Sequence, residues 1–187
     1  MKVKIQGKVY VAREDDINTD LIIPARYLNT SDPSELGKHA MEDLDPERHP
    51  IPFLNEDGSC DYTFVVPGKN FGCGSSREHA VWSLAAAGIE AVIAPSPVPF
   101  ARIFYRNCVN EGGVIPLEYS SVGKGGGKLT NILETGEDLT LDMNEEIPYL
   151  IRTDGTRFPL NPFTGIAREI IDAGGLTNYN KARLNLE

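Results

Sequence analysis

Cysteine is scarce in this 187-residue sequence, which contains only Cys60, Cys73 and Cys108. They are widely spaced and form no Cys-x-x-Cys pair, so neither a zinc site nor a redox disulfide is indicated. The closely spaced cysteines typical of iron–sulfur ligation are missing as well. We therefore expect Cys60 and Cys108 to be ordinary thiols and Cys73 to serve packing. We also expect the chain to hold no metal and no cofactor of its own.

Long apolar runs and an excess of positive charge are also absent. No apolar segment approaches the roughly 20 residues of a membrane-spanning helix. The N-terminal residues alternate charged with apolar side chains, unlike a signal peptide. The formal net charge is −9, which argues against nucleic-acid binding because that needs clustered cations. The sequence predicts a cytoplasmic protein that binds neither membrane nor nucleic acid.

The order of predicted elements indicates an α/β fold in a single domain, 1–187. A parallel strand–helix–strand unit with right-handed crossovers is predicted from these segments: strands 62–66, 89–94 and 114–117, and helices 76–87 and 100–109. Alternating apolar residues around Gly7 predict a hairpin-like pair over 2–12. A small β layer is predicted from strands 129–133, 139–143 and 148–152. The remaining predictions are a glycine-rich tip at 123–127, a helix at 162–173 and a polar C-terminal tail at 176–187.

A long polar segment, 28–52, interrupts this pattern before the first strand of the parallel unit. Asp32 followed by a proline predicts a helix start there, and the helix is expected over 33–42. The segment also carries His39 and His49, which have no partner at metal-ligand spacing and are predicted to lie at the surface. Because long loops in compact domains are usually functional, we interpret 28–52 as a lid or specificity loop.

The stretch 68–80 carries the strongest chemical signal. Gly68, Gly72 and Gly74 let the backbone approach a ligand closely, and two serines and Arg77 follow. Ser75 and Glu78 have the spacing of a capping box at a helix start. The free N–H groups there, together with a guanidinium, would suit a carboxylate or a phosphate. The pattern is neither a dinucleotide fingerprint nor a P-loop, and a simple turn followed by a helix cap is the plainer interpretation.

Three stretches together resemble the aconitase superfamily. Gly-Cys-Gly-Ser-Ser-Arg-Glu-His at 72–79 resembles the Gly-Ser-Ser-Arg-Glu-His signature of that family's mobile swivel domain. The segment 16–28, with Asn-Thr-Asp at its centre, resembles the N-terminal active-site segment. Phe-Ala-Arg-Ile-Phe-Tyr-Arg-Asn at 100–107 resembles the Phe-Ala-Arg-Ile-Phe-x-x-Asn helix. With Tyr-Leu-Asn-Thr-Ser-Asp-Pro at 27–33, the free-standing chain is most similar to the small subunits of 3-isopropylmalate dehydratase.

This resemblance implies a swivelling β/β/α domain, as in the aconitase C-terminal domain, and a set of site residues. Ser75 takes the position of the catalytic base. Substrate-binding positions fall on Ser76, Arg77, Thr19, Asp20, Asn29 and Thr30. From the residues alone, Thr19-Asp20 would be interpreted as a turn or cap before the next apolar residues. His79 is expected to support the loop rather than to react.

The implied function is that of half an enzyme. The partner would be a large subunit carrying a [4Fe–4S] cluster, in a heterodimer or heterotetramer. The complex would be a hydro-lyase that isomerises 2-isopropylmalate to 3-isopropylmalate through 2-isopropylmaleate, in leucine biosynthesis. Asn29, in place of the arginine common in homoaconitase-like relatives, favours an apolar substituent.

Several alternatives remain at this point. The same chemistry could act on homoaconitate, citraconate, methylmalate or a dimethylmalate, since Thr30 is shared with the homoaconitase-like pattern. The chain could instead be a non-catalytic module that binds a carboxylate. A cysteine enzyme using Cys73 and His79 is a third possibility, although the sequence lacks the expected context of a nucleophile.

Overall fold

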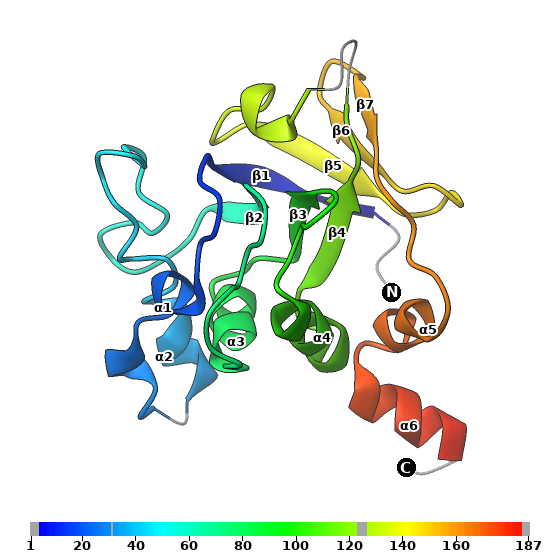
Figure 1. The fold of residues 1–187 in the computed structure, drawn as a ribbon, viewed down its shortest axis with the longest axis horizontal. Helices are drawn as coiled ribbons and strands as arrows, with labels where there is room; N and C mark the ends of the chain where they lie inside the picture. Colours follow the sequence, from blue (N-terminus) through cyan, green and yellow to red (C-terminus); the bar gives the residue numbers. More distant parts are fainter. Residues whose placement is uncertain (1–3, 31, 123–126, 185–187) are drawn as a thin grey trace.

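One mixed, seven-stranded sheet organises the computed structural model, which describes residues 4–30, 32–122 and 127–184 (Figure 1). Its strand order is β4-β3-β2-β1-β5-β6-β7. The first four in that order pair in parallel, whereas β5, β6 and β7 extend the sheet antiparallel from β1. The strands are β1 Lys4–Ala12, β2 Tyr62–Pro67, β3 Ala91–Pro95, β4 Ile115–Tyr119, β5 Asp138–Asp142, β6 Tyr149–Arg152 and β7 Arg157–Pro159.

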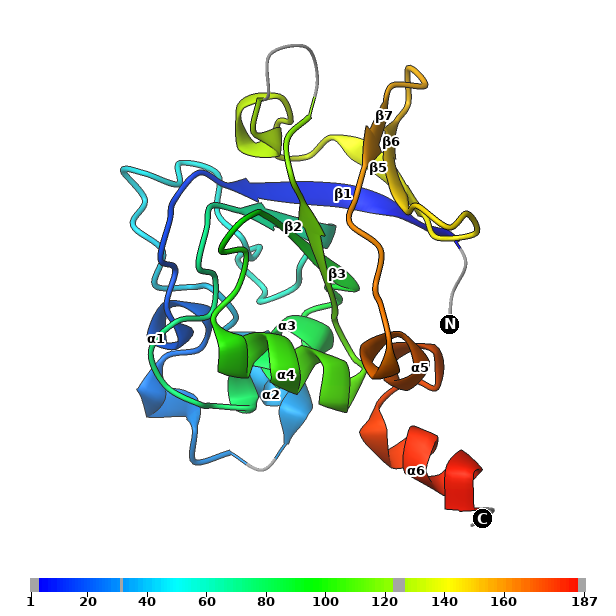
Figure 2. The same cartoon turned by 45° about the vertical axis from the view of Figure 1, so that its right-hand side comes forward.

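Helices cover one side of the parallel strands, as the two views in Figures 1 and 2 show. These are α1 Thr19–Ile22, α2 Pro33–Gly37, α3 His79–Ala86 and α4 Arg102–Glu111. Helices α5 Ile166–Asp172 and α6 Leu176–Leu184 follow at the C-terminal end. Short 3-10 turns complete the set, η1 Ala25–Tyr27 and η2 Leu129–Asn131. The predicted parallel α/β unit with an added β layer is therefore confirmed.

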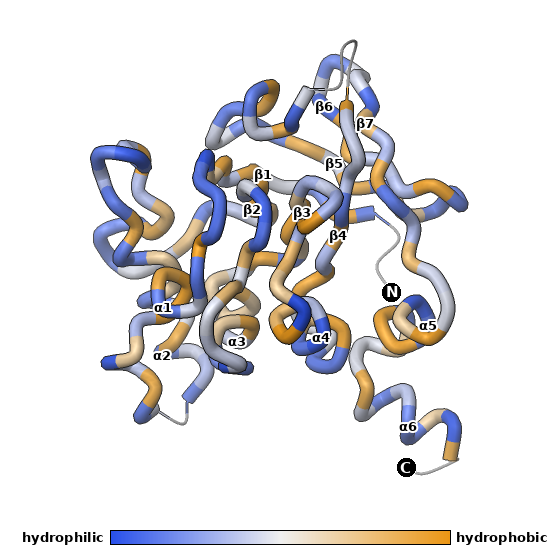
Figure 3. The backbone as a smooth tube through the Cα atoms, viewed as in Figure 1, coloured by the Kyte–Doolittle hydropathy of each residue, from blue (hydrophilic) through white to orange (hydrophobic). Residues whose placement is uncertain are grey.

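Two hydrophobic cores pack on opposite faces of the parallel strands. Tyr10 and Ala12 of β1 belong to the core beneath the helices, whereas Val9 and Val11 belong to the core enclosed by β5, β6, β7 and η2. This alternation follows from the two-residue period of a strand. In Figure 3 the hydrophobic positions gather in strands and helices, while the connecting loops are largely hydrophilic.

Two of the strand predictions are wrong. Residues 4–12 form one continuous strand rather than a hairpin pair. Gly7 does not turn the chain; a Cβ there would lie 2.0 Å from Thr63 Oγ1 of the neighbouring strand, so the glycine permits close packing. The predicted strand 129–133 is instead the 3-10 turn η2, and β7 had no sequence prediction.

The predicted helices are present, but their first and last residues differ from the prediction. The helix predicted over 33–42 ends at Gly37, although Asp32 does cap it by accepting from the Ser34 N–H at 2.9 Å. The helix predicted from residue 162 begins only at Ile166, after Gly165. The tail 176–187 is helical as far as Leu184. Most of the predicted tip at 123–127 lies outside the described residues.

Candidate functional site

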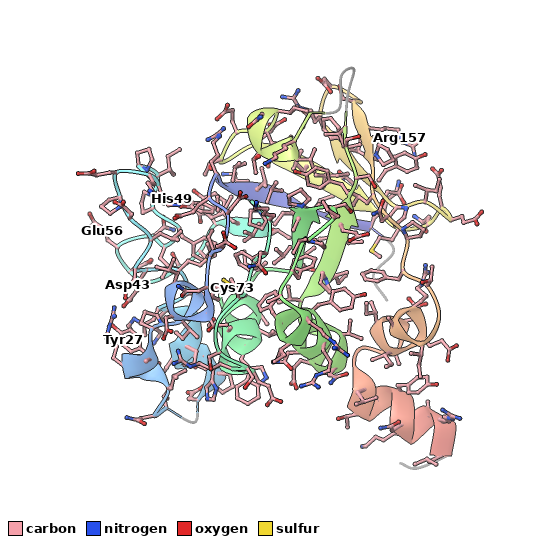
Figure 4. All side chains as sticks on the ribbon, in the orientation of Figure 1. Tyr27, Asp43, His49, Glu56, Cys73 and Arg157 are labelled. Carbon is pink, nitrogen blue, oxygen red and sulfur yellow. The ribbon has the colours of Figure 1, made fainter. Side chains whose placement is uncertain are left out.

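Two loops that leave the carboxyl ends of β1 and β2 lie side by side and form the candidate site. Their backbones are joined along their length: the Gly68 N–H donates to Glu14 O at 3.0 Å, and the Gly72 N–H donates to Ile17 O at 2.8 Å. A parallel bridge then pairs Asn18 with Cys73. Figure 4 labels Cys73 where the two loops meet, above α3. Parallel strands place ligand sites outside their carboxyl ends, so this position agrees with the topology.

Thr19 connects the two loops through its side chain. Its hydroxyl accepts from the Ser75 N–H at 3.1 Å, and its own N–H donates to Cys73 O at 2.8 Å. Only 1% of Thr19 is exposed, so these bonds are sheltered from water. The preceding Asn18 caps α1, since its Oδ1 accepts from the Asp20 and Leu21 N–H groups at 2.9 and 3.0 Å. The capping role that the sequence suggested for Thr19-Asp20 therefore belongs to Asn18.

Arg77 and Asp20 form an ion pair across the same junction. The pair joins Arg77 Nη1 to Asp20 Oδ1, and 23% of the arginine side chain is exposed against 58% of the carboxylate. One guanidinium nitrogen is engaged in this bond. A guanidinium has five N–H donors, so the bond orients Arg77 and leaves donors for an incoming carboxylate.

Ser75 and Ser76 are exposed at the end of the Gly-rich loop. The predicted capping box is wrong: α3 begins at His79, and its N-cap, Glu78, makes no side-chain cap hydrogen bond. In a capping box the Glu78 side chain would accept from the Ser75 N–H, but that N–H donates to Thr19 of the other loop instead. The Ser75 hydroxyl is thus not committed to a helix cap.

The helix α4 packs against the Gly-rich loop through two of its side chains. Gly72 has a φ of +76°, and a Cβ there would lie 2.2 Å from Phe104 Cγ, so only glycine fits against that buried ring. Asn107 Nδ2 donates to Ser76 O at 3.4 Å. Both supporting side chains come from the 100–107 stretch. Sequence reasoning gave Asn107 no role, although it ends the third motif.

Asn29 and Thr30 lie on the turn that follows η1. Asn29 is exposed. Thr30 makes local bonds: its N–H donates to Tyr27 O, and its hydroxyl accepts from the Asp32 N–H, each at 3.3 Å. The structure therefore brings Thr19, Asp20 and the 75–77 segment together. Asn29 and Thr30 are not part of this junction, since they follow η1, which comes after the C-terminal end of α1.

Cys73 and His79 do not form a nucleophile–base pair. The Cys73 thiol donates to Asp16 O at 3.3 Å, and burial together with the Asp16 carboxylate raises the pKa of the thiol. The His79 ring lies against Trp82, with 4.9 Å between centroids. A protonated thiol is a poor nucleophile, so the geometry does not favour a cysteine enzyme.

The two remaining cysteines offer no site either. Burial raises the pKa of the Cys108 thiol, which lies in the core, and also that of Cys60. Within residues 4–30, 32–122 and 127–184, no group of three or more His, Cys, Asp or Glu side chains could hold a metal ion. None of the helices in these ranges combines the length and apolar character needed to cross a membrane.

Comparison with known proteins gives concordant matches. The Aconitase C-terminal domain family matches residues 2–122. A 3-isopropylmalate dehydratase small subunit of Caldanaerobacter subterraneus is 44% identical over 180 residues, which are 96% of this chain and 99% of that protein. The small subunit 1 of Archaeoglobus fulgidus is 44% identical over 90% of this chain and 92% of its own.

A solved structure is also similar. The crystal structure of a 3-isopropylmalate dehydratase chain from Methanocaldococcus jannaschii superimposes with a TM-score of 0.76 at 38% identity. The match covers 97% of this chain and 96% of that one. The likeness therefore extends over β5–β7 and the C-terminal helices, beyond the residues that the family match covers.

Proposed function

Because the chain belongs to the aconitase C-terminal domain family, within the 3-isopropylmalate dehydratase small subunits, we propose that it isomerises 2-isopropylmalate to 3-isopropylmalate together with a large subunit. It is the small subunit of a hydro-lyase of leucine biosynthesis. The near-complete coverage of relatives at 44% identity carries this assignment. Composition favours a cytoplasmic location. We treat 1–187 as one domain with the 28–52 segment as its specificity loop.

The reaction removes and restores water, and it needs a Lewis acid for the leaving hydroxyl and a base for a weakly acidic C–H. The described residues of this chain do not fit a [4Fe–4S] cluster, since they contain no suitable ligand group. We therefore assign the cluster to the large subunit. This chain would supply the base and the groups that hold the hydroxy-dicarboxylate.

Ser75 is the proposed base. A serine alkoxide is unfavourable in water and becomes accessible only where donors stabilise it in a site closed to solvent. Ser75 is exposed in the isolated chain, so the large subunit must cover it. Thr19 fixes the backbone of Ser75 through the 3.1 Å bond. Arg77, oriented by Asp20, would bind a substrate carboxylate, and Ser76 would donate a further hydrogen bond.

Co-expression with the large subunit under anaerobic conditions tests the proposal. The assembled complex should interconvert the two isopropylmalates, and either chain alone should be inactive. The assay should include homoaconitate, citraconate, methylmalate and dimethylmalate as competing substrates. Preference for any of these would refute the isopropylmalate assignment, and activity of the isolated chain would refute the two-subunit division of labour.

Arg77→Lys should chiefly raise KM. Lysine keeps the positive charge but loses the planar fork that binds a carboxylate through two N–H groups. The loss of one charge-assisted hydrogen bond, about 1.5–3 kcal/mol, corresponds to roughly 10- to 150-fold in kcat/KM. Steady-state kinetics of the assembled complex measures the split. A fall confined to kcat would show that Arg77 acts on the transition state instead.

Asn29→Arg should shift selectivity toward substrates with an additional carboxylate. Asn29 is exposed on the turn after η1, so the longer side chain can be accommodated without disturbing the core. The ratio of kcat/KM for homoaconitate to that for isopropylmalate should rise. An unchanged ratio in a fully assembled complex would remove 29–30 from the specificity determinants.

A further inference from the structure

The segment between α2 and β2 is fastened to the body of the protein at His49. This residue is buried, with 3% of its side chain exposed, which corrects its prediction as a surface histidine. Its Nε2 lies 3.1 Å from Glu14 Oε2. The ring of Tyr10 stacks on the His49 ring, with 6.4 Å between centroids. The backbone N–H of His49 donates to Asp45 O at 2.8 Å. Figure 4 shows His49 on this segment, beside β1.

Glu14 accepts from two consecutive residues of that segment. One carboxylate oxygen faces His49, and the other accepts from Arg48 Nη1. The two contacts differ in burial, because 64% of the Arg48 side chain is exposed against 3% of the His49 side chain. Exposed ion pairs contribute little, whereas an unpaired carboxylate or imidazole in a sheltered position is unfavourable. The Glu14–His49 bond is therefore the stronger constraint.

The backbone of Glu14 begins the junction of the two site loops. Its carbonyl accepts from the Gly68 N–H, and a Cβ on Gly68 would lie 2.4 Å from that oxygen. The next residues add hydrogen bonds between the same two loops: Asp15 Oδ1 accepts from the Lys69 N–H at 2.9 Å, and Asp16 Oδ1 accepts from Asn70 Nδ2 at 2.7 Å. The last hydrogen bond along these two loops is the one from the Ser75 N–H to the Thr19 hydroxyl.

We infer that Glu14 and His49 are positioning residues that hold the 45–53 segment and the two site loops in one arrangement. The same segment also contacts β1 at Tyr10, whose hydroxyl donates to Ile51 O at 3.1 Å, and together with Tyr10 it lines part of a pocket of about 590 Å³. The effect on catalysis rests on the proposed function. The structural coupling itself does not, so the two can be tested separately.

Hydrogen exchange of the full chain tests the coupling without any activity assay. His49→Leu removes the donor to Glu14 but keeps an apolar side chain beside Tyr10. Backbone amides of 68–75, which His49 does not contact, should exchange about tenfold faster, because the loop junction opens more often. Glu137→Gln is the matched control. Glu137 is 16% exposed and paired with Arg152, much as Glu14 is 20% exposed and paired with His49. The control therefore breaks a similarly sheltered pair, but between β5 and β6, away from the site loops.

The exchange result has two clear outcomes. Faster exchange at 68–75 in His49→Leu, but not in Glu137→Gln, supports the inference. Faster exchange limited to 45–53 overturns it. Equal acceleration in both variants overturns it as well, since a general loss of stability would then explain the effect.

Kinetics of the assembled complex provides the second readout. Displacement of Ser75 should lower kcat of His49→Leu about 10- to 100-fold. His49→Gln retains an N–H donor and should recover part of that loss, whereas Glu137→Gln should retain wild-type kcat and KM. A wild-type complex without isopropylmalate activity would refute the proposed function alone. An active wild type with a fully active His49→Leu would refute the positioning role.

Discussion

Replacing Ser75 by alanine should lower kcat of the assembled complex about 10²–10⁴-fold, the usual effect of removing a general base. Substrate binding should be largely preserved, because Arg77 and Ser76 remain. The melting temperature of the small subunit should hardly change. The hydrogen bond that fixes Ser75 uses its backbone N–H, which donates to Thr19 Oγ1 and survives the substitution.

The structure makes this a cleaner test than the sequence alone allowed. A Ser75 that capped α3 would lose about 0.5–2 kcal/mol of stability on truncation. Helix α3 instead begins at His79, so the loss of turnover and the loss of a cap are no longer confounded. Ser120→Ala, an exposed serine whose hydroxyl donates to Asn161 at 3.2 Å, is the control. Near-normal turnover of Ser75→Ala in an intact complex would exclude Ser75 as the base.

Thr19→Val would then examine the same junction from the opposite loop. Valine keeps the shape of threonine but leaves the Ser75 N–H without its acceptor. The variant should lower both stability and kcat, whereas Ser75→Ala should lower kcat alone. This contrast separates a residue that reacts from a residue that holds it in place.

The sequence predicted the features that local patterns control. Apolar runs and glycine or proline signals located strands β2, β3 and β4 and the α3 and α4 helices to within a few residues. The three motifs also brought Thr19 and Asp20 to the 75–77 segment correctly, because they follow the carboxyl ends of adjacent parallel strands. The capping role of Asp32 needed only its neighbour Ser34 and was predicted as well.

Three of the errors share a different cause, which is contact between residues distant in the chain. Ser75 is bound by Thr19, His49 by Glu14, and Gly7 packs against Thr63. In each case a local pattern (capping box, isolated histidine, glycine in an apolar run) has an ordinary local interpretation. The actual partner comes from another part of the chain, and the local spacing at each position does not report it.

Gly72→Ala should be strongly destabilising for two separate reasons. A side chain at φ +76° is strained by about 1–2 kcal/mol. The new methyl group would also overlap Phe104, whose Cγ lies 2.2 Å from the Cβ position and whose ring is buried. Overpacking of this kind adds about 1–3 kcal/mol. At roughly 2–4 °C per kcal/mol for a chain of this size, the melting temperature should fall by about 4–20 °C.

Gly88→Ala is the matched control, because it separates backbone strain from overlap. Gly88 has a φ of +100°, but a Cβ there meets nothing within 4 Å. It should therefore show only the strain component, a fall of about 2–8 °C. Thermal unfolding of both variants, together with Phe104→Ala and the Gly72→Ala/Phe104→Ala double variant, completes the test. Truncation of Phe104 removes the two closest of the overlapping atoms, so the double variant should be less destabilised than the sum of the single changes. Equal melting temperatures for Gly72→Ala and Gly88→Ala would show that Phe104 yields to the methyl group, and that α4 does not rigidly support the loop that carries Ser75.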